Sequence, residues 1–89
     1  KSISIGEKSN ISINNLKTEN SNTGIAVKDS SYANINNVFM SNLDTCLSVY
    51  NKKQEFNGGT LKIKNFKCQN TKNKIYKDSR SILVIENEL

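Results

Sequence analysis

The chain has 89 residues, contains no His, Pro or Trp, and has a formal net charge of +5. Without His, acid–base chemistry near neutral pH would require a Lys, Tyr or carboxyl group with a shifted pKa. No apolar run approaches the roughly 20 residues of a membrane-spanning helix, so we expect no membrane span. Low aromatic content and abundant Asn are compatible with disorder, but the regular alternation of apolar and polar residues indicates β-strands.

The sequence repeats itself, beginning with residues 9–16 (SNISINNL), which match residues 31–38 (SYANINNV) at an offset of 22. The match continues from residues 25–27 to residues 47–49. A third copy follows at an offset of 28 in residues 61–70, and a partial fourth copy follows after a further 22 residues. Self-similarity at such a period is typical of solenoids, in which each repeat buries its apolar face against its neighbours.

Each copy contains two alternating apolar residues, then an Asn, another apolar residue and a final alternating pair. We therefore predict an all-β fold, a right-handed parallel β-helix of about four coils with three short strands per coil. Helical spacing of apolar residues is absent, as is the spacing of leucine-rich repeats. A slip of one residue in the last coil would turn Ile82 and Val84 inward. The predicted inward columns are Ile11/Ala33/Leu61/Leu83, Ile13/Ile35/Ile63/Ile85, Leu16/Val38/Phe66 and Ile25/Leu47/Ile75.

Residues 1–89 are predicted to form a single β-helix domain. The chain begins without Met, already alternates like a strand, and shows no signal-peptide pattern. We therefore expect it to be the C-terminal coils of a larger protein. Nothing in the sequence caps the first or last coil, so we expect the open coil ends to be covered by the rest of the parent chain or by another copy.

A column of asparagines follows the first apolar pair of each repeat. We predict a sharp bend there in the left-handed conformation, which Asn tolerates, and hydrogen bonds between the stacked amides. A second column, of serines, is interpreted as turn residues. The asparagines are Asn15, Asn37, Asn65 and Asn87, and the serines are Ser9, Ser31 and Ser81, with Gly59 in the third repeat.

The two cysteines, Cys46 and Cys68, lie outside any CxxC pattern and have no His partners, which argues against a zinc site. The repeat register places Cys68 in a column with Thr18 and Met40, and Cys46 in a different column. We therefore predict that the two thiols are not bonded to each other and that Cys68 is a core residue.

The longer third repeat carries an insertion within residues 50–59. Insertions in solenoids bulge on one face and often bear binding residues, and Gly58 and Gly59 would let a ligand approach the backbone. The alternative is a solvated loop in which Lys53 pairs with Glu55 and Phe56 folds back over the coil. The candidate ligand-binding residues are Tyr50, Lys52, Lys53, Glu55, Lys62 and Lys64.

Residues 28–31 (KDSS) contain side chains of the kinds found in catalytic sites. We interpret them instead as a turn in which Asp29 or Ser30 accepts hydrogen bonds from nearby backbone amides.

The positive charge suits an acidic partner such as a uronate polysaccharide, a nucleic acid or a membrane surface. A bias towards Lys and Asn also accounts for it, and we favour that explanation. No RNP-like or helix-turn-helix pattern is present, so we expect no nucleic-acid partner.

Three segments together resemble a group of uncharacterised bacterial β-helix modules within the pectin-lyase-like superfamily. They are residues 4–9 (SIGEKS), 24–31 (GIAVKDSS) and 50–56 (YNKKQEF). In that group GE-x-S, GIA-x-KD-x-S and KK-x-E-aromatic-G segments recur, often beside a CotH-kinase-like domain. Asn57 departs from the pattern, since it stands between Phe56 and the glycines. The resemblance implies a β-helix in a secreted or cell-envelope protein and implies no particular activity.

Polysaccharide lyases and hydrolases of this fold need clustered carboxylates, calcium ligands or a positioned base. None of the eight acidic residues is adjacent to another, and no Asp repeats in a strand column. We therefore predict no catalytic residue, metal site or cofactor within the chain, and enzyme status stays open. The predicted function is a non-catalytic scaffold or binding module with an acidic polysaccharide as candidate ligand. Alternatives are the C-terminal part of a β-helix lyase or hydrolase with its catalytic residues upstream, and a fibrous adhesin or tail-spike stalk.

Overall fold

A computed structural model describes residues 3–53 and 55–89 of the chain. These residues form one parallel sheet of five strands, and none of them is helical. Each strand pairs with the next one along the chain. None of the described residues belongs to a helix that is long and apolar enough to cross a membrane. The strands are β1 (Ile3–Ile5), β2 (Asn10–Lys28), β3 (Tyr32–Tyr50), β4 (Thr60–Lys77) and β5 (Ile82–Glu88).

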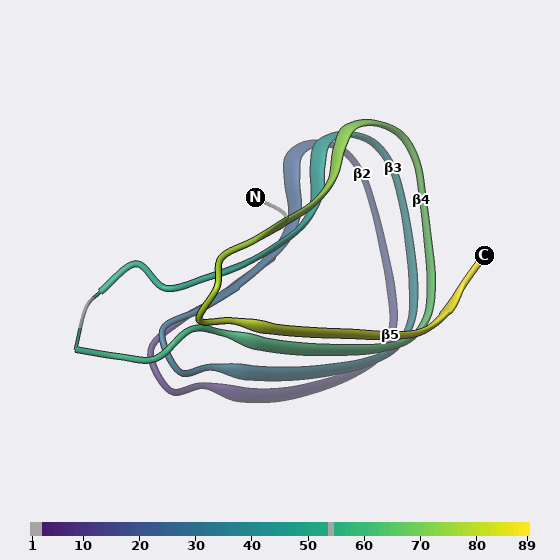
Figure 1. Ribbon diagram of the computed structural model, residues 1–89. Coiled ribbons are helices and arrows are strands. Elements are labelled where there is room, and N and C mark those ends of the chain that lie inside the picture. The colour runs from purple at the N-terminus through teal and green to yellow at the C-terminus, as the bar shows by residue number, and fades with distance from the viewer. Residues whose placement is uncertain (1–2, 54) are drawn as a thin grey trace.

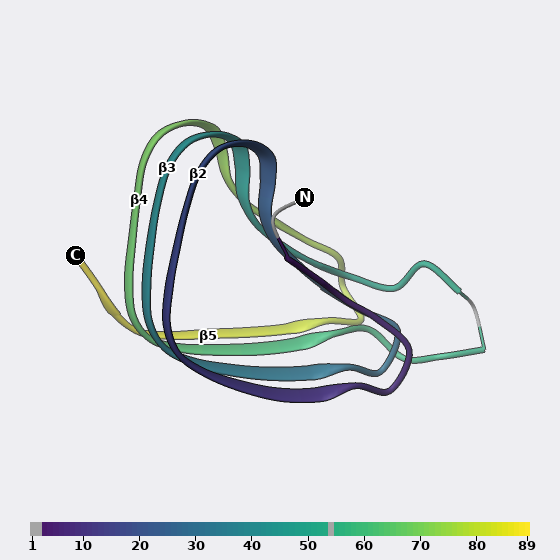
Figure 2. The same cartoon turned by 180° about the vertical axis from the view of Figure 1, so that it is seen from behind.

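The long strands β2, β3 and β4 bend along their length and lie one behind another, as Figure 1 shows and the reverse view in Figure 2 confirms. The prediction of three short strands per repeat is therefore wrong: one strand of 18 or 19 residues continues through the bends. Within each strand one Asn adopts the left-handed conformation, at Asn20, Asn42 and Asn70, with φ of 58°, 59° and 55°. Pairing continues on both sides of these residues.

The pairing register is the one that the repeats predict. Ile13 pairs with Ile35 and Ile35 with Ile63, at offsets of 22 and 28 residues. Ile35 and Ile63 are 0% and 2% exposed, which confirms that this column faces inward. In the last repeat Ile63 pairs with Ile85, so the one-residue slip does not occur and Val84 faces solvent.

The apolar core lies between the inward faces of the bent strands, and its middle layers are the most deeply buried. Leu47, Leu61 and Phe66 have no exposed surface. Members of the same columns at either end of the stack are more open: Ile11 in β2 is 36% exposed and Ile75 in β4 is 39% exposed. Each strand is thus covered by its neighbours, as expected when repeats bury apolar surface only against adjacent repeats.

The predicted asparagine column is present, and its side-chain amides are hydrogen-bonded from strand to strand. The Nδ2 of Asn37 donates to the Oδ1 of Asn15 at 3.1 Å, and the Nδ2 of Asn65 donates to the Oδ1 of Asn37 at 2.8 Å. Asn87 continues the series by donating to Asn65 at 3.2 Å. The left-handed bend predicted for this column is wrong, because the left-handed asparagines are the separate set led by Asn20.

The prediction for the cysteines is also wrong. Cys46 in β3 and Cys68 in β4 form a disulfide with Cα atoms 6.4 Å apart. The two residues do lie in different columns, since Cys68 pairs with Met40. Cys46 is nevertheless fully buried and Cys68 partly buried against the same core. Side chains from different columns can therefore contact each other across the core enclosed by the bent strands. The column assignment alone does not predict such contacts.

Candidate functional site

The insertion before β4 is held by the buried carboxylate of Asp29, which has a φ of 54° and no exposed surface. The Oδ1 of Asp29 accepts hydrogen bonds from the backbone N–H of Lys52 at 2.7 Å and of Lys53 at 2.9 Å. Burial raises the pKa of Asp29, but these two hydrogen bonds and the charges of Lys28 and Lys53 outweigh it, so the pKa is lowered. The turn interpretation of residues 28–31 is confirmed.

A second set of hydrogen bonds fixes the far side of the same insertion. The Oγ of Ser30 accepts from the backbone N–H of Asn57 at 2.8 Å. The Nδ2 of Asn51 donates to the carbonyl oxygens of Lys53 and Phe56, both at 2.9 Å, and of Asn57 at 3.0 Å. These bonds fix the backbone on either side of the insertion, at Lys53 and at Phe56 and Asn57, so part of its sequence serves structure and not recognition.

The outer side chains of the insertion contact the turn between β1 and β2. Lys53 forms an ion pair with Glu7, and the hydrogen bond to Glu7 together with its charge raises the pKa of Lys53. The Nζ of Lys8 lies 5.6 Å from the centroid of the Phe56 ring, within the range of a cation–π contact. The ion pair of Lys53 is therefore with Glu7, whereas the alternative interpretation of the loop placed it with Glu55.

Gly58 and Gly59 approach the chain's own backbone closely. A Cβ at Gly58 would overlap the carbonyl of Arg80, and a Cβ at Gly59 would overlap the carbonyl of Val27. Neither glycine has a positive φ. Close packing against the neighbouring turns thus explains both glycines without any ligand.

Two of the six candidate residues line one groove in the described part of the chain. Lys62 and Lys64 face outward from β4 and line a groove of about 390 Å³, whereas Lys52, Lys53 and Glu55 belong to the insertion. Tyr50 also lies outside the groove, with its ring packed edge-on against that of Tyr76 at 6.1 Å between centroids. We call this groove the lysine groove, and it is lined by Asn34, Asn36, Lys62, Ile63, Lys64, Val84 and Glu86.

The lysine groove combines charge with amides. Asn34 pairs with Lys62 and Lys62 with Val84, so the three side chains form one outward row. The Nζ of Lys62 lies 5.7 Å from the centroid of the Tyr32 ring. The Nδ2 of Asn36 donates to the Oδ1 of Asn14 at 2.9 Å. The groove can therefore offer an ammonium, amide hydrogen-bonding groups and a small apolar surface to one extended ligand.

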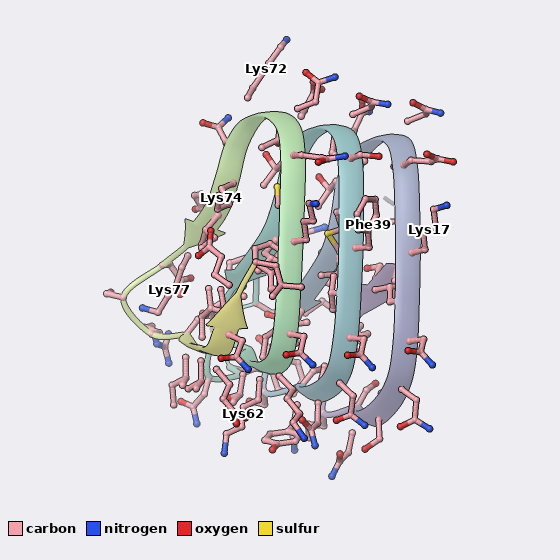
Figure 3. The ribbon with its side chains drawn as sticks, turned by 90° about the vertical axis from the view of Figure 1, so that its right-hand side faces the viewer. Lys17, Phe39, Lys62, Lys72, Lys74 and Lys77 are labelled. Carbon is pink, nitrogen blue, oxygen red and sulfur yellow. A yellow bond between two sulfur atoms is a disulfide. The ribbon has the colours of Figure 1, made fainter. Side chains whose placement is uncertain are left out.

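A second groove, of about 260 Å³, lies on a different face, where Figure 3 shows Lys17 and Phe39 projecting from neighbouring strands. We call it the phenylalanine groove. This groove is not among the sites predicted from the sequence, although the 22- and 28-residue offsets align Lys17, Phe39 and Lys67 in one outward row. Its lining is Asn15, Leu16, Lys17, Asn37, Val38, Phe39, Asn65, Lys67 and Leu89.

Among residues 3–53 and 55–89, no group of three or more Cys, Asp or Glu side chains is placed to hold a metal ion. Both cysteines are in the disulfide. Comparison with protein-family models, curated proteins and solved structures finds no match for the chain.

Proposed function

We propose that the chain is a stretch of right-handed parallel β-helix of about four coils. The support is the parallel pairing of each strand with the next, at offsets of 22, 28 and 22 residues, together with the hydrogen-bonded asparagine column. Stacking in register creates flat outward faces on which side chains from successive strands stand in rows about 4.8 Å apart. Such faces suit a ligand that is itself extended and repetitive.

On this fold we propose a non-catalytic binding module for acidic polysaccharide, with the lysine groove as its binding face. The observation that carries the proposal is the presence of Lys62 and Lys64 beside the amides of Asn34 and Asn36 in one groove. The ammonium groups would pair with carboxylates, and the amides would hydrogen-bond to sugar hydroxyls. Glu86 lines the same groove and offsets part of the charge of the lysines, so binding would be weak and sensitive to salt.

The disulfide supports a secreted or cell-envelope setting for this function. A disulfide between Cys46 and Cys68 persists in oxidising environments and is rare in the cytosol of most organisms. Acidic polysaccharides of cell surfaces and matrices occur in these same extracellular environments.

The proposal is tested by titrating the protein with hexagalacturonate and, for comparison, with the neutral galactose hexamer. Lys62→Gln with Lys64→Gln should weaken hexagalacturonate binding about fivefold, because exposed ion pairs contribute up to about 1 kcal/mol each. The matched control is Lys52→Gln with Lys53→Gln, which removes equal charge from the insertion. It should leave the affinity within about twofold, since these lysines lie outside the groove.

Two results would contradict the proposal. The first is equal weakening by both double variants, which would show a general response to net charge. The second is equal affinity for the acidic and the neutral hexamer, which would remove the role of the lysines. A lower melting temperature in the Lys52/Lys53 variant with unchanged binding agrees with the proposal, because Lys53 pairs with Glu7.

A further inference from the structure

The phenylalanine groove has an electrostatic character that the lysine groove lacks. Its lining contains two lysines and no acidic residue. Within the described residues, neither Lys17 nor Lys67 takes part in an ion pair, while Lys53, Lys72 and Lys74 do. An anion entering this groove can pair with the ammonium group of Lys17 or of Lys67 without first breaking an ion pair.

The ring of Phe39 lies between these two lysines. Lys17, Phe39 and Lys67 are direct neighbours on β2, β3 and β4, so the two lysine Cα atoms are separated by two strand spacings, roughly 10 Å. The Nζ of Lys67 lies 5.7 Å from the Phe39 centroid. Phe39 is only partly buried, although it is a large apolar residue on an outward face. The row therefore presents an apolar surface with a positive charge on each side.

The asparagine column forms the adjoining wall. Each Oδ1 of Asn15 and Asn37 accepts one hydrogen bond from the column, which leaves each oxygen a second lone pair. Asn65 uses one of its two amide hydrogens within the column. The column can therefore pair with hydroxyl groups while its internal hydrogen bonds stay intact. Leu89 closes the groove, and its backbone N–H donates to the carbonyl of Phe66 at 2.8 Å.

From these three features we propose that the phenylalanine groove is a second binding site, separate from the lysine groove, for a single uronic-acid residue of a short acidic sugar. The carboxylate pairs with Lys17 or Lys67, the less polar face of the sugar lies against Phe39, and its hydroxyls reach the asparagine amides. The volume of about 260 Å³ is smaller than that of most small-molecule pockets, which favours one ring over a nucleotide with base, ribose and phosphate.

Site-resolved NMR titration of the whole chain with digalacturonate tests the proposal. The side-chain amide signals of Asn15, Asn37 and Asn65 should shift with saturation, and neutral galactobiose should leave them in place. Lys17→Gln with Lys67→Gln should weaken the affinity measured at these signals about fivefold or more. The control is Lys72→Gln, an exposed lysine that Figure 3 places at the top of the view, apart from Lys17 and Phe39.

The control should change the affinity by less than about twofold. Lys62→Gln with Lys64→Gln should also leave the affinity at the asparagine signals unchanged. The second site is therefore tested independently of the lysine groove. Phe39→Leu should weaken binding while circular dichroism confirms that the variant is folded, which separates ring contact from charge. The proposal is overturned if the shifts fall only on Asn34 and Asn36, if Lys72→Gln weakens binding equally, or if adenosine monophosphate binds this groove more tightly than digalacturonate.

Discussion

Lys74 in β4 and Glu88 in β5 form an ion pair at the C-terminal end of the stack. Glu88 pairs with Phe66, so it occupies the column that Leu16, Val38 and Phe66 fill in the earlier strands. Lys77 likewise continues the column of Val27 and Val49. Charged residues thus stand in β4 and β5 at positions that apolar residues occupy in the preceding strands, and charge at such positions opposes pairing with another apolar strand.

The first prediction concerns this charged end. Lys77→Val with Glu88→Leu should increase self-association, because it extends two apolar columns over exposed positions of β4 and β5. Analytical ultracentrifugation over a range of concentrations measures the effect. Lys62→Val with Glu86→Leu makes the same change in charge and apolarity at outward positions, and should associate less. Equal association of the two variants would show that the inward columns have no special role.

The second prediction concerns the disulfide. Cys46→Ser with Cys68→Ser should lower the free energy of unfolding by about 3 kcal/mol, because a crosslink over 22 residues restricts the unfolded chain. Chemical denaturation measures this difference. Mass spectrometry of the alkylated wild-type protein, before and after reduction, supplies the control. Free thiols in the unreduced protein would contradict the pairing.

The third prediction concerns acid stability. The folded state lowers the pKa of Asp29, so its contribution to stability is fully present above the unfolded-state pKa of roughly 3.9. That contribution is lost as the pH falls through the lower folded-state pKa. Asp29→Asn tolerates the positive φ but removes the charge, so the variant should be about 2 kcal/mol less stable near pH 7. Its stability should also depend less steeply on pH below about 4.

Circular dichroism during acid titration measures this dependence. The comparison is Asp44→Asn, because the side chain of Asp44 is 57% exposed. An Asp29→Asn protein that keeps the acid-unfolding profile of the wild type would show that the buried carboxylate is not the group responsible.

The fourth prediction concerns close packing at the insertion. Gly59→Ala should destabilise the protein by about 1–3 kcal/mol, because the added Cβ meets the rigid backbone of Val27. Gly6→Ala is the matched control, since its Cβ would lie 3.0 Å from the Cε of the flexible Lys28 side chain. Thermal unfolding of both variants measures the difference. A Gly59→Ala protein as stable as Gly6→Ala would mean that the backbone of β2 at Val27 shifts easily.

The strand register could be predicted from the sequence because the repeats are aligned by many residues at once. A shift by one residue would expose Ile35 and Ile63 together, so the apolar pattern allows only one pairing. The left-handed positions were assigned to the wrong asparagines. Both columns contain Asn in every full repeat, and only the backbone path distinguishes Asn15 from Asn20.

The candidate site was predicted less well, because its residues are brought together across strands and turns. The ion pair of Lys53 with Glu7 joins residues that no repeat offset aligns. The disulfide likewise crosses the core between different columns. The row of Lys17, Phe39 and Lys67, by contrast, follows directly from the 22- and 28-residue offsets.

The register of the stacked strands underlies both proposed grooves, and methyl NOE spectroscopy tests it most directly. Parallel neighbours lie about 4.8 Å apart, which places paired side chains within NOE range. The fold predicts NOEs between the methyl groups of Ile13 and Ile35, and between those of Ile35 and Ile63. The absence of both NOEs in the folded protein, or backbone NOEs that show an antiparallel order, would contradict the fold and both sites built on it.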